Sequence, residues 1–156
     1  MESAASADRD RTGQKMMRGL FFLFFMGFAL SLAAQSESVD AIKQRVEHAS
    51  PADQVRLCLH VAQAQLQHAS DFYKSNDNAN ARRALQDVET YGVRAAKISA
   101  ESGKHQKDAE IAVRKISYRL SELARDADLD ERPPIKAVMT NIDKAHDDLL
   151  ASMFKK

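Results

Sequence analysis

Glycine and proline are scarce in the greater part of this chain. The only glycines in residues 37–156 are Gly92 and Gly103, and the only prolines are Pro51, Pro133 and Pro134. Because these residue types interrupt regular structure most strongly, so few of them favours long helices joined by short turns. No window alternates between apolar and polar residues for long enough to predict a strand. The sequence therefore predicts an all-α fold.

Apolar residues recur every three or four positions in five segments, as expected for amphipathic helices. A short first helix is predicted from about Val39 to His48. Ser50 and Pro51 have the chemistry of an N-cap and a first helical position, so a second helix should start there. The apolar stripes of the four longer helices run from Val55 to Tyr73, from Ala81 to Ile98, from Ala109 to Ala127 and from Ile135 to Met153.

Four long helices with short connections predict an antiparallel bundle with up-down-up-down topology. The short first helix should cover one end or one groove of this bundle. Ser102 and Gly103 should break or kink the chain between the second and third long helices, because glycine is the weakest ordinary helix former. In the alternative architecture these two helices fuse through Gly103 and the domain dimerises.

The N-terminal segment has the pattern of a secretory signal peptide. An uncharged run of 13 residues, 20–32, follows Lys15 and Arg18 and precedes small residues. This run is shorter than the roughly 20 residues that span a bilayer. A basic region, a short apolar region and a small-residue end are the parts of a signal peptide. We therefore predict a signal peptide over residues 1–36 and a single domain over 37–156, in a secreted or periplasmic bacterial protein.

Two cleavage registers fit the small-residue rule. Cleavage between Ser36 and Glu37 releases a polar N-terminus directly, whereas the alternative cut lies between Ala33 and Ala34. Translation is predicted to begin at Met16 or Met17, because the preceding stretch is long and of mixed charge. After cleavage no stable membrane insertion is expected. If the segment is not cleaved, the domain becomes a membrane-tethered extracytoplasmic stalk.

Charge is balanced overall but unevenly distributed. Residues 37–156 contain 19 basic and 19 acidic residues, whereas residues 81–125 carry a net charge of +4 and residues 126–148 a net charge of −4. Such asymmetry can mark a partner surface. The preferred interpretation, however, is that the acidic last helix pairs with its basic neighbours inside one bundle. The predicted interaction surface consists of Arg94, Lys97, Lys104, Lys107, Arg114, Lys115 and Arg119.

Patterns that carry catalysis or bind cofactors are absent from the sequence. Di-metal bundles use Glu-x-x-His pairs, and the nearest match is a single pair formed by Asp143 and His146. Covalent haem attachment needs Cys-x-x-Cys-His, but Cys58 is the only cysteine. We expect Cys58 to be buried, with a disulfide between two copies as the alternative. No catalytic, cofactor-binding or metal-binding residues are predicted.

These observations predict an exported helical-bundle protein that acts as a structural or protein-interaction module rather than an enzyme. Its partner is expected to be a protein, either a second copy or another chain. Nucleic acid is not expected, because the domain is neutral and has few aromatic residues. The alternatives are a bundle that binds a small ligand or a metal, and the membrane-tethered stalk.

Overall fold

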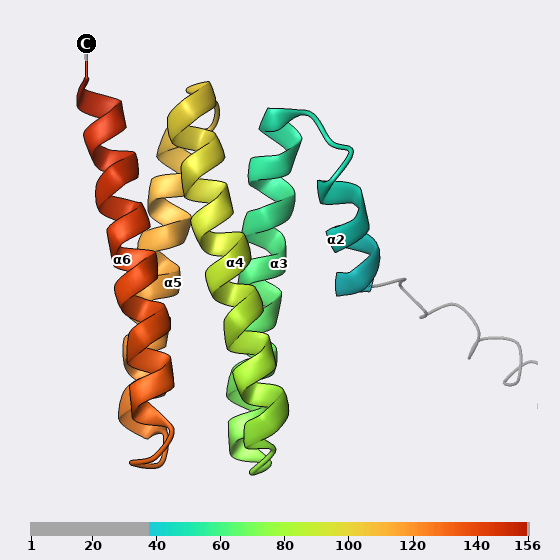
Figure 1. Cartoon of the computed structure of the whole chain (residues 1–156), viewed down its shortest axis with the longest axis vertical. Helices are drawn as coiled ribbons and strands as arrows, with labels where there is room; N and C mark the ends of the chain where they lie inside the picture. Colours follow the sequence, from blue (N-terminus) through green and yellow to red (C-terminus); the bar gives the residue numbers. More distant parts are fainter. Residues whose placement is uncertain (1–37, 156) are drawn as a thin grey trace, which may run out of the picture. The chain divides into compact units, whose positions relative to one another are not determined.

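A computed structural model describes residues 38–155 (Figure 1). The predicted signal peptide, translation start and cleavage positions lie outside the described residues. Within residues 38–155 the chain forms five helices and no strand, which confirms the predicted all-α class. The helices are α2 (Val39–Val46), α3 (Pro51–Lys74), α4 (Asn78–Ser102), α5 (Gln106–Asp126) and α6 (Arg132–Phe154).

The start of α3 matches the sequence prediction. Ser50 is the N-cap, and its hydroxyl oxygen accepts a hydrogen bond of 3.3 Å from the Asp53 amide. Pro51 follows in the first turn, where an amide hydrogen would have no partner within the helix. Asp77 caps α4 in the same way, since its carboxylate accepts a hydrogen bond of 3.3 Å from the Asn80 amide.

Gly103 ends α4 and separates it from α5. Its φ of 67° lies in the left-handed region, which glycine adopts without the clash of a side chain. The chain then turns through Lys104 and His105 before α5 begins. The alternative in which these helices fuse through Gly103 is therefore wrong.

The last helix begins earlier than its apolar stripe suggested. The sequence predicted helical structure from Ile135, but α6 begins at Arg132 and includes Pro133 and Pro134 in its first turn. The first amides of a helix have no intrahelical acceptor, so proline loses no hydrogen bond at these positions. Two consecutive prolines thus mark the start of α6 rather than the preceding loop.

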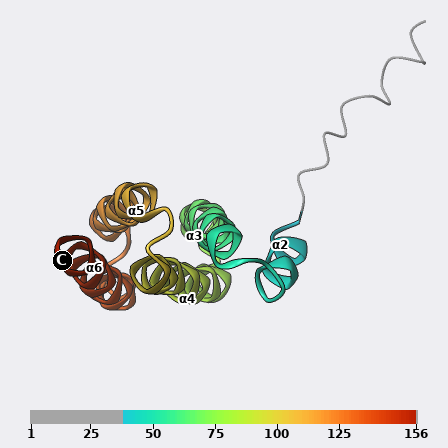
Figure 2. The same ribbon diagram turned by 90° about the horizontal axis from the view of Figure 1, so that it is seen from above.

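The helices pack through their apolar stripes into a bundle-like fold. α3 packs against α4, α4 against α6, and α5 against α6, while α2 packs against α3 (Figures 1 and 2). Viewed from above, α3 and α5 are neighbours on one side of the core, and α4 and α6 on the other (Figure 2). The largest fully buried side chains include Leu85, Ile116, Leu120, Ile142 and Leu149.

One glycine of α4 lies directly against an isoleucine side chain of α6. Gly92 is buried within α4, and a Cβ atom at this position would lie 2.5 Å from Cδ1 of Ile142 on α6. Because real Cβ atoms are not found so close to a neighbour, a side chain at position 92 would require the Ile142 side chain or the helices to shift.

Candidate interaction surface

The structure disperses the seven basic residues predicted to form one surface. Arg94 faces α2 and forms a bidentate contact with Glu47, with nitrogen-to-oxygen distances of 2.5 and 3.3 Å. Arg119 faces α3 and donates a hydrogen bond of 2.8 Å to the Gln67 side chain. Lys97 lies on α4 with its Nζ 4.0 Å from Glu101, and Lys104 lies in the turn before α5. The structure therefore engages Arg94 with the end of α2 and Arg119 with α3, so these two residues do not belong to one free basic surface.

The other three residues share the outward face of α5. Lys107, Arg114 and Lys115 are exposed. At about 100° per residue, they lie opposite the buried stripe of α5. That stripe consists of Ala109, Val113, Ile116, Leu120 and Leu123. Within residues 38–155, the side chains of Lys107 and Lys115 form no ion pair, whereas Arg114 contacts Glu110 on the same helix at 3.4 Å.

Two large apolar side chains project from the same face. Ile111 is 45% exposed and Tyr118 is 61% exposed, and they lie one heptad apart. We use the name basic face of α5 for Lys107, Ile111, Arg114, Lys115, Tyr118 and Arg125, which fall within an arc of about 100° on a helical wheel. Its single acidic neighbour inside this arc is the half-buried Glu122.

Ile111 was missed by the sequence analysis. The buried stripe of α5 was read correctly, but the position of Ile111 away from that stripe was not used. A helical wheel would have revealed it, because Ile111 and Tyr118 fall on the side opposite the core-facing residues.

Charge pairing between the basic and acidic segments is sparse. Within the described residues, Arg82 and Glu131 form the one ion pair between an arginine or lysine and a carboxylate that joins segment 81–125 to segment 126–148, beside a contact of His146 with Glu110. Asp143 instead accepts a hydrogen bond from Ser117. Asp147 and Asp148 on α6 are exposed and form no ion pair. Internal pairing therefore accounts for little of the charge asymmetry.

The Arg82–Glu131 pair belongs to a partly buried cluster, centred on the buried Glu131, that sequence reasoning missed. The Glu131 side chain is 4% exposed, and Arg82 donates two hydrogen bonds to its carboxylate, of 2.9 and 2.6 Å. The Tyr73 hydroxyl donates a third, of 3.2 Å. This cluster connects α3, α4 and the residue that precedes α6.

Within the cluster, the pKa of Glu131 is lowered and the pKa of Tyr73 is raised. The hydrogen bonds from Arg82 hold the pKa of the Glu131 carboxyl below its usual value, because they favour the ionised form. Burial and the neighbouring Glu131 carboxylate raise the pKa of Tyr73 to about 12. The polar atoms are thus mutually satisfied, and the cluster serves to position the helix ends.

The histidine considered as a metal ligand and the carboxylate three residues before it contact different residues of α5. His146 contacts Glu110 on α5 through Nε2 at 3.2 Å, whereas Asp143 contacts Ser117. Across the part of the chain that the structure describes, no group of three or more His, Cys, Asp or Glu side chains is arranged to hold a metal ion.

Cys58 is buried, as predicted. Its exposed fraction is 0%, and burial raises the pKa of its thiol to about 11. Both properties disfavour the thiolate that would form a disulfide at neutral pH.

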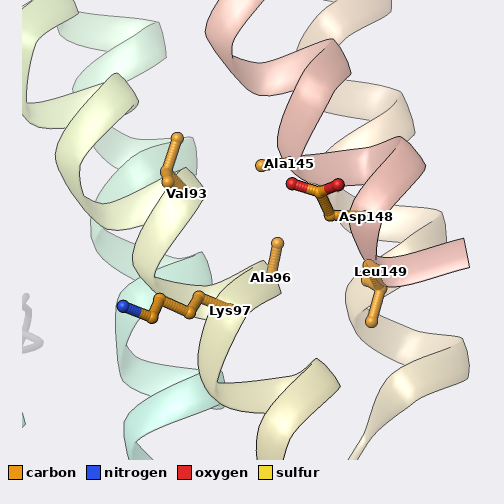
Figure 3. A pocket seen from close by; sticks show the side chains of 6 residues that line it. All are labelled: Val93, Ala96, Lys97, Ala145, Asp148 and Leu149. Atoms are coloured by element: carbon orange, nitrogen blue, oxygen red, sulfur yellow. The ribbon is translucent and has the colours of Figure 1, made fainter. Parts of the chain in front are cut away.

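A shallow cleft of about 250 Å³ lies between α4 and α6 (Figure 3). Val93, Ala96, Ala145 and Leu149 form its apolar floor. Asp148 directs its carboxylate toward α4, whereas the Lys97 side chain extends away from α6 (Figure 3). The two charged residues at its edge therefore do not converge on one point.

None of the helices in the described part of the chain has both the length and the apolar character needed to span a bilayer. No protein-family model, curated protein or solved structure matches this chain. The class defined by the fold is a small all-α, bundle-like protein, and its function must be inferred from its surface.

Proposed function

We propose that this protein is an interaction module that binds an acidic protein segment on the basic face of α5. The observation that carries the proposal is the combination, on one exposed helix face, of two large apolar side chains and four basic ones. Exposed apolar residues that occur singly are normal on a soluble surface. Here Ile111 and Tyr118 are flanked by Lys107, Arg114 and Lys115, none of which is engaged by another helix.

The chemistry of the face defines the partner. Tyrosine and arginine are enriched among residues that dominate binding energy, and apolar anchors at helical spacing suit an amphipathic segment. The lysines and arginines favour carboxylates on that segment, which should raise the association rate and make it dependent on salt. An extended or helical segment with acidic residues around one or two apolar anchors fits these requirements.

The proposal includes the arrangement of the domain and its location. We propose that α3–α6 form an antiparallel four-helix bundle with up-down-up-down topology, supported by the short connections at residues 75–77, 103–105 and 127–131. We also propose that the protein is exported and acts outside the cytoplasm without catalytic activity. The signal-peptide pattern of residues 1–36 supports the location.

Charge reversal on α5 tests the binding proposal. We expect Lys107→Glu/Arg114→Glu/Lys115→Glu to reduce recovery of a specific partner at least about tenfold in quantitative affinity capture, because three attractive contacts become repulsive. Ile111→Ala/Tyr118→Ala should have a similar effect without changing the net charge. The partner should carry an acidic segment, and its recovery should fall as salt increases.

The matched control reverses three exposed basic residues on other helices, in the variant Lys74→Glu/Arg83→Glu/Lys144→Glu. It changes net charge by the same amount and should leave recovery unchanged. If every captured protein is retained equally by the α5 variant, or lost equally from the control, α5 is not the binding surface.

A further inference from the structure

The shortest helix of the described chain is attached differently from the others. α2 has 8 residues, fewer than the ~12–15 that an isolated helix needs to be stable in water. Among the helices it packs only against α3, while α3–α6 each pack against two or three others. Its helical structure therefore depends on packing against α3 and on side-chain contacts with α4.

Two apolar side chains provide the buried contact of α2. Ile42 is 3% exposed and Val46 is 0% exposed, and they are one turn apart on the face toward α3. The rest of α2 is exposed or half-buried. This is a small apolar contact compared with the long stripes that join α3, α4, α5 and α6.

Two ion pairs tie the same helix to α4. Lys43 Nζ lies 2.6 Å from the Asp87 carboxylate, which also accepts a hydrogen bond of 2.8 Å from Gln65 on α3. Lys43 also lies 5.9 Å from the centre of the Tyr91 ring. Just past the end of α2, Glu47 contacts Arg94. The members of both pairs are 23–56% exposed, so each pair stabilises the docked state weakly and is screened by salt.

The single thiol of the chain lies close to this attachment. Cys58 on α3 is completely buried and belongs to the same apolar cluster as Val46 of α2. It lies one heptad before Gln65 on the same face of α3, and the Gln65 amide shares the Asp87 carboxylate with Lys43 of α2. We infer that α2 and its ion pairs cover the thiol on this side of α3.

From these contacts we propose that α2 is a lid that undocks from α3 and α4 as a unit while α3–α6 stay folded. Undocking breaks two weak ion pairs and exposes two aliphatic side chains, whereas global unfolding exposes the whole core. Local openings of this kind occur well below the free energy of global unfolding. The lid uncovers an apolar strip of α3 that includes Cys58.

Alkylation of Cys58 measures the opening, because the chain has one cysteine. The protein, purified as the host cell leaves its N-terminus, is treated with excess N-ethylmaleimide, and labelling is followed by mass spectrometry. We expect the wild-type rate to change little with urea below the unfolding transition, since a local opening exposes little surface. Lys43→Ala/Glu47→Ala should label about three- to tenfold faster, because both ion pairs are lost.

The matched control, Arg56→Ala/Lys97→Ala, removes ion pairs of α3 and α4 that do not involve α2. Its labelling rate should equal that of the wild type. Raising salt to about 1 M should accelerate labelling of the wild type, because the screening length falls to about 3 Å. The lid is disproved if labelling follows global unfolding with its full urea dependence, or if neither the lid variant nor salt changes the rate.

Discussion

At the scale of single residues, Glu131 is the side chain whose surroundings differ most from those of an ordinary surface acid. It precedes α6, is buried, and accepts hydrogen bonds from Arg82 and Tyr73. The end of α3 and the start of α4 are therefore joined at one carboxylate to the distant start of α6. The contribution of Glu131 to the stability of the fold should depend on pH, in a direction that follows from its lowered pKa.

We expect Glu131→Gln to destabilise the protein by about 1–3 kcal/mol near pH 7, because a charged acceptor is replaced by an amide that faces the Arg82 donors. The pKa of Glu131 is lower in the folded protein than its usual value of 4.5. Its stabilising effect is therefore complete above that pH and is lost as the pH falls through the folded-state pKa. The difference in unfolding free energy between wild type and variant should shrink accordingly.

Urea unfolding at a series of pH values from neutral to acidic measures this difference. Asp130→Asn provides the control, since Asp130 is an exposed carboxylate one position earlier with no hydrogen bond or ion pair within residues 38–155. A constant difference between wild type and Glu131→Gln across the series would show that the carboxylate charge is not responsible.

At the scale of the elements, α4 and α6 meet where Gly92 lies against the Ile142 side chain. We expect Gly92→Ala to destabilise the protein by up to about 2 kcal/mol, because Ile142 is fully buried and the ~1–3 kcal/mol cost of overpacking exceeds the gain in helix propensity of about 1 kcal/mol. Adding Ile142→Val removes Cδ1, the atom that a Cβ at position 92 would approach to 2.5 Å.

Thermal or urea unfolding of the four proteins in this double-mutant cycle gives the coupling between the two positions. The double variant should be clearly more stable than the sum of the single effects predicts. Thr90→Ala, at an exposed position of the same helix, serves as a control for helix propensity alone. Additive effects at positions 92 and 142 would mean that the helices separate freely at this point.

The elements also show what sequence patterns can and cannot supply. The start of α3 at Pro51 and the break at Gly103 were predictable, because capping and positive φ are local properties of a few residues. The early start of α6 at Arg132 was not predicted, because two consecutive prolines are also typical of a loop, and the sequence does not distinguish a loop from the first turn of a helix. The sequence also could not predict that Arg94 and Arg119 contact different helices. These contacts depend on which neighbouring helix each helix face packs against.

At the scale of the whole molecule, the proposed binding surface and the proposed lid lie on different helices. The basic face lies on α5 and the lid is α2, and these two helices do not pack against each other. Reversing charges on α5 should therefore leave the labelling of Cys58 unchanged, and weakening the lid should leave capture by α5 unchanged. The two proposals can consequently fail independently.

The location of the protein is tested by its mass after expression in a bacterial host that exports it. We expect an intact mass that matches a chain beginning at Glu37, because the small residues before it fit signal cleavage. This form has no net charge by its Lys, Arg, Asp and Glu content, which suits a partner selected by a local basic face rather than by a global field. Native mass spectrometry of the same sample reports any bound ligand and the number of copies. A chain beginning at Ala34 would establish the alternative register, whereas a mass that retains residues 20–34 would contradict cleavage and favour the membrane-tethered form.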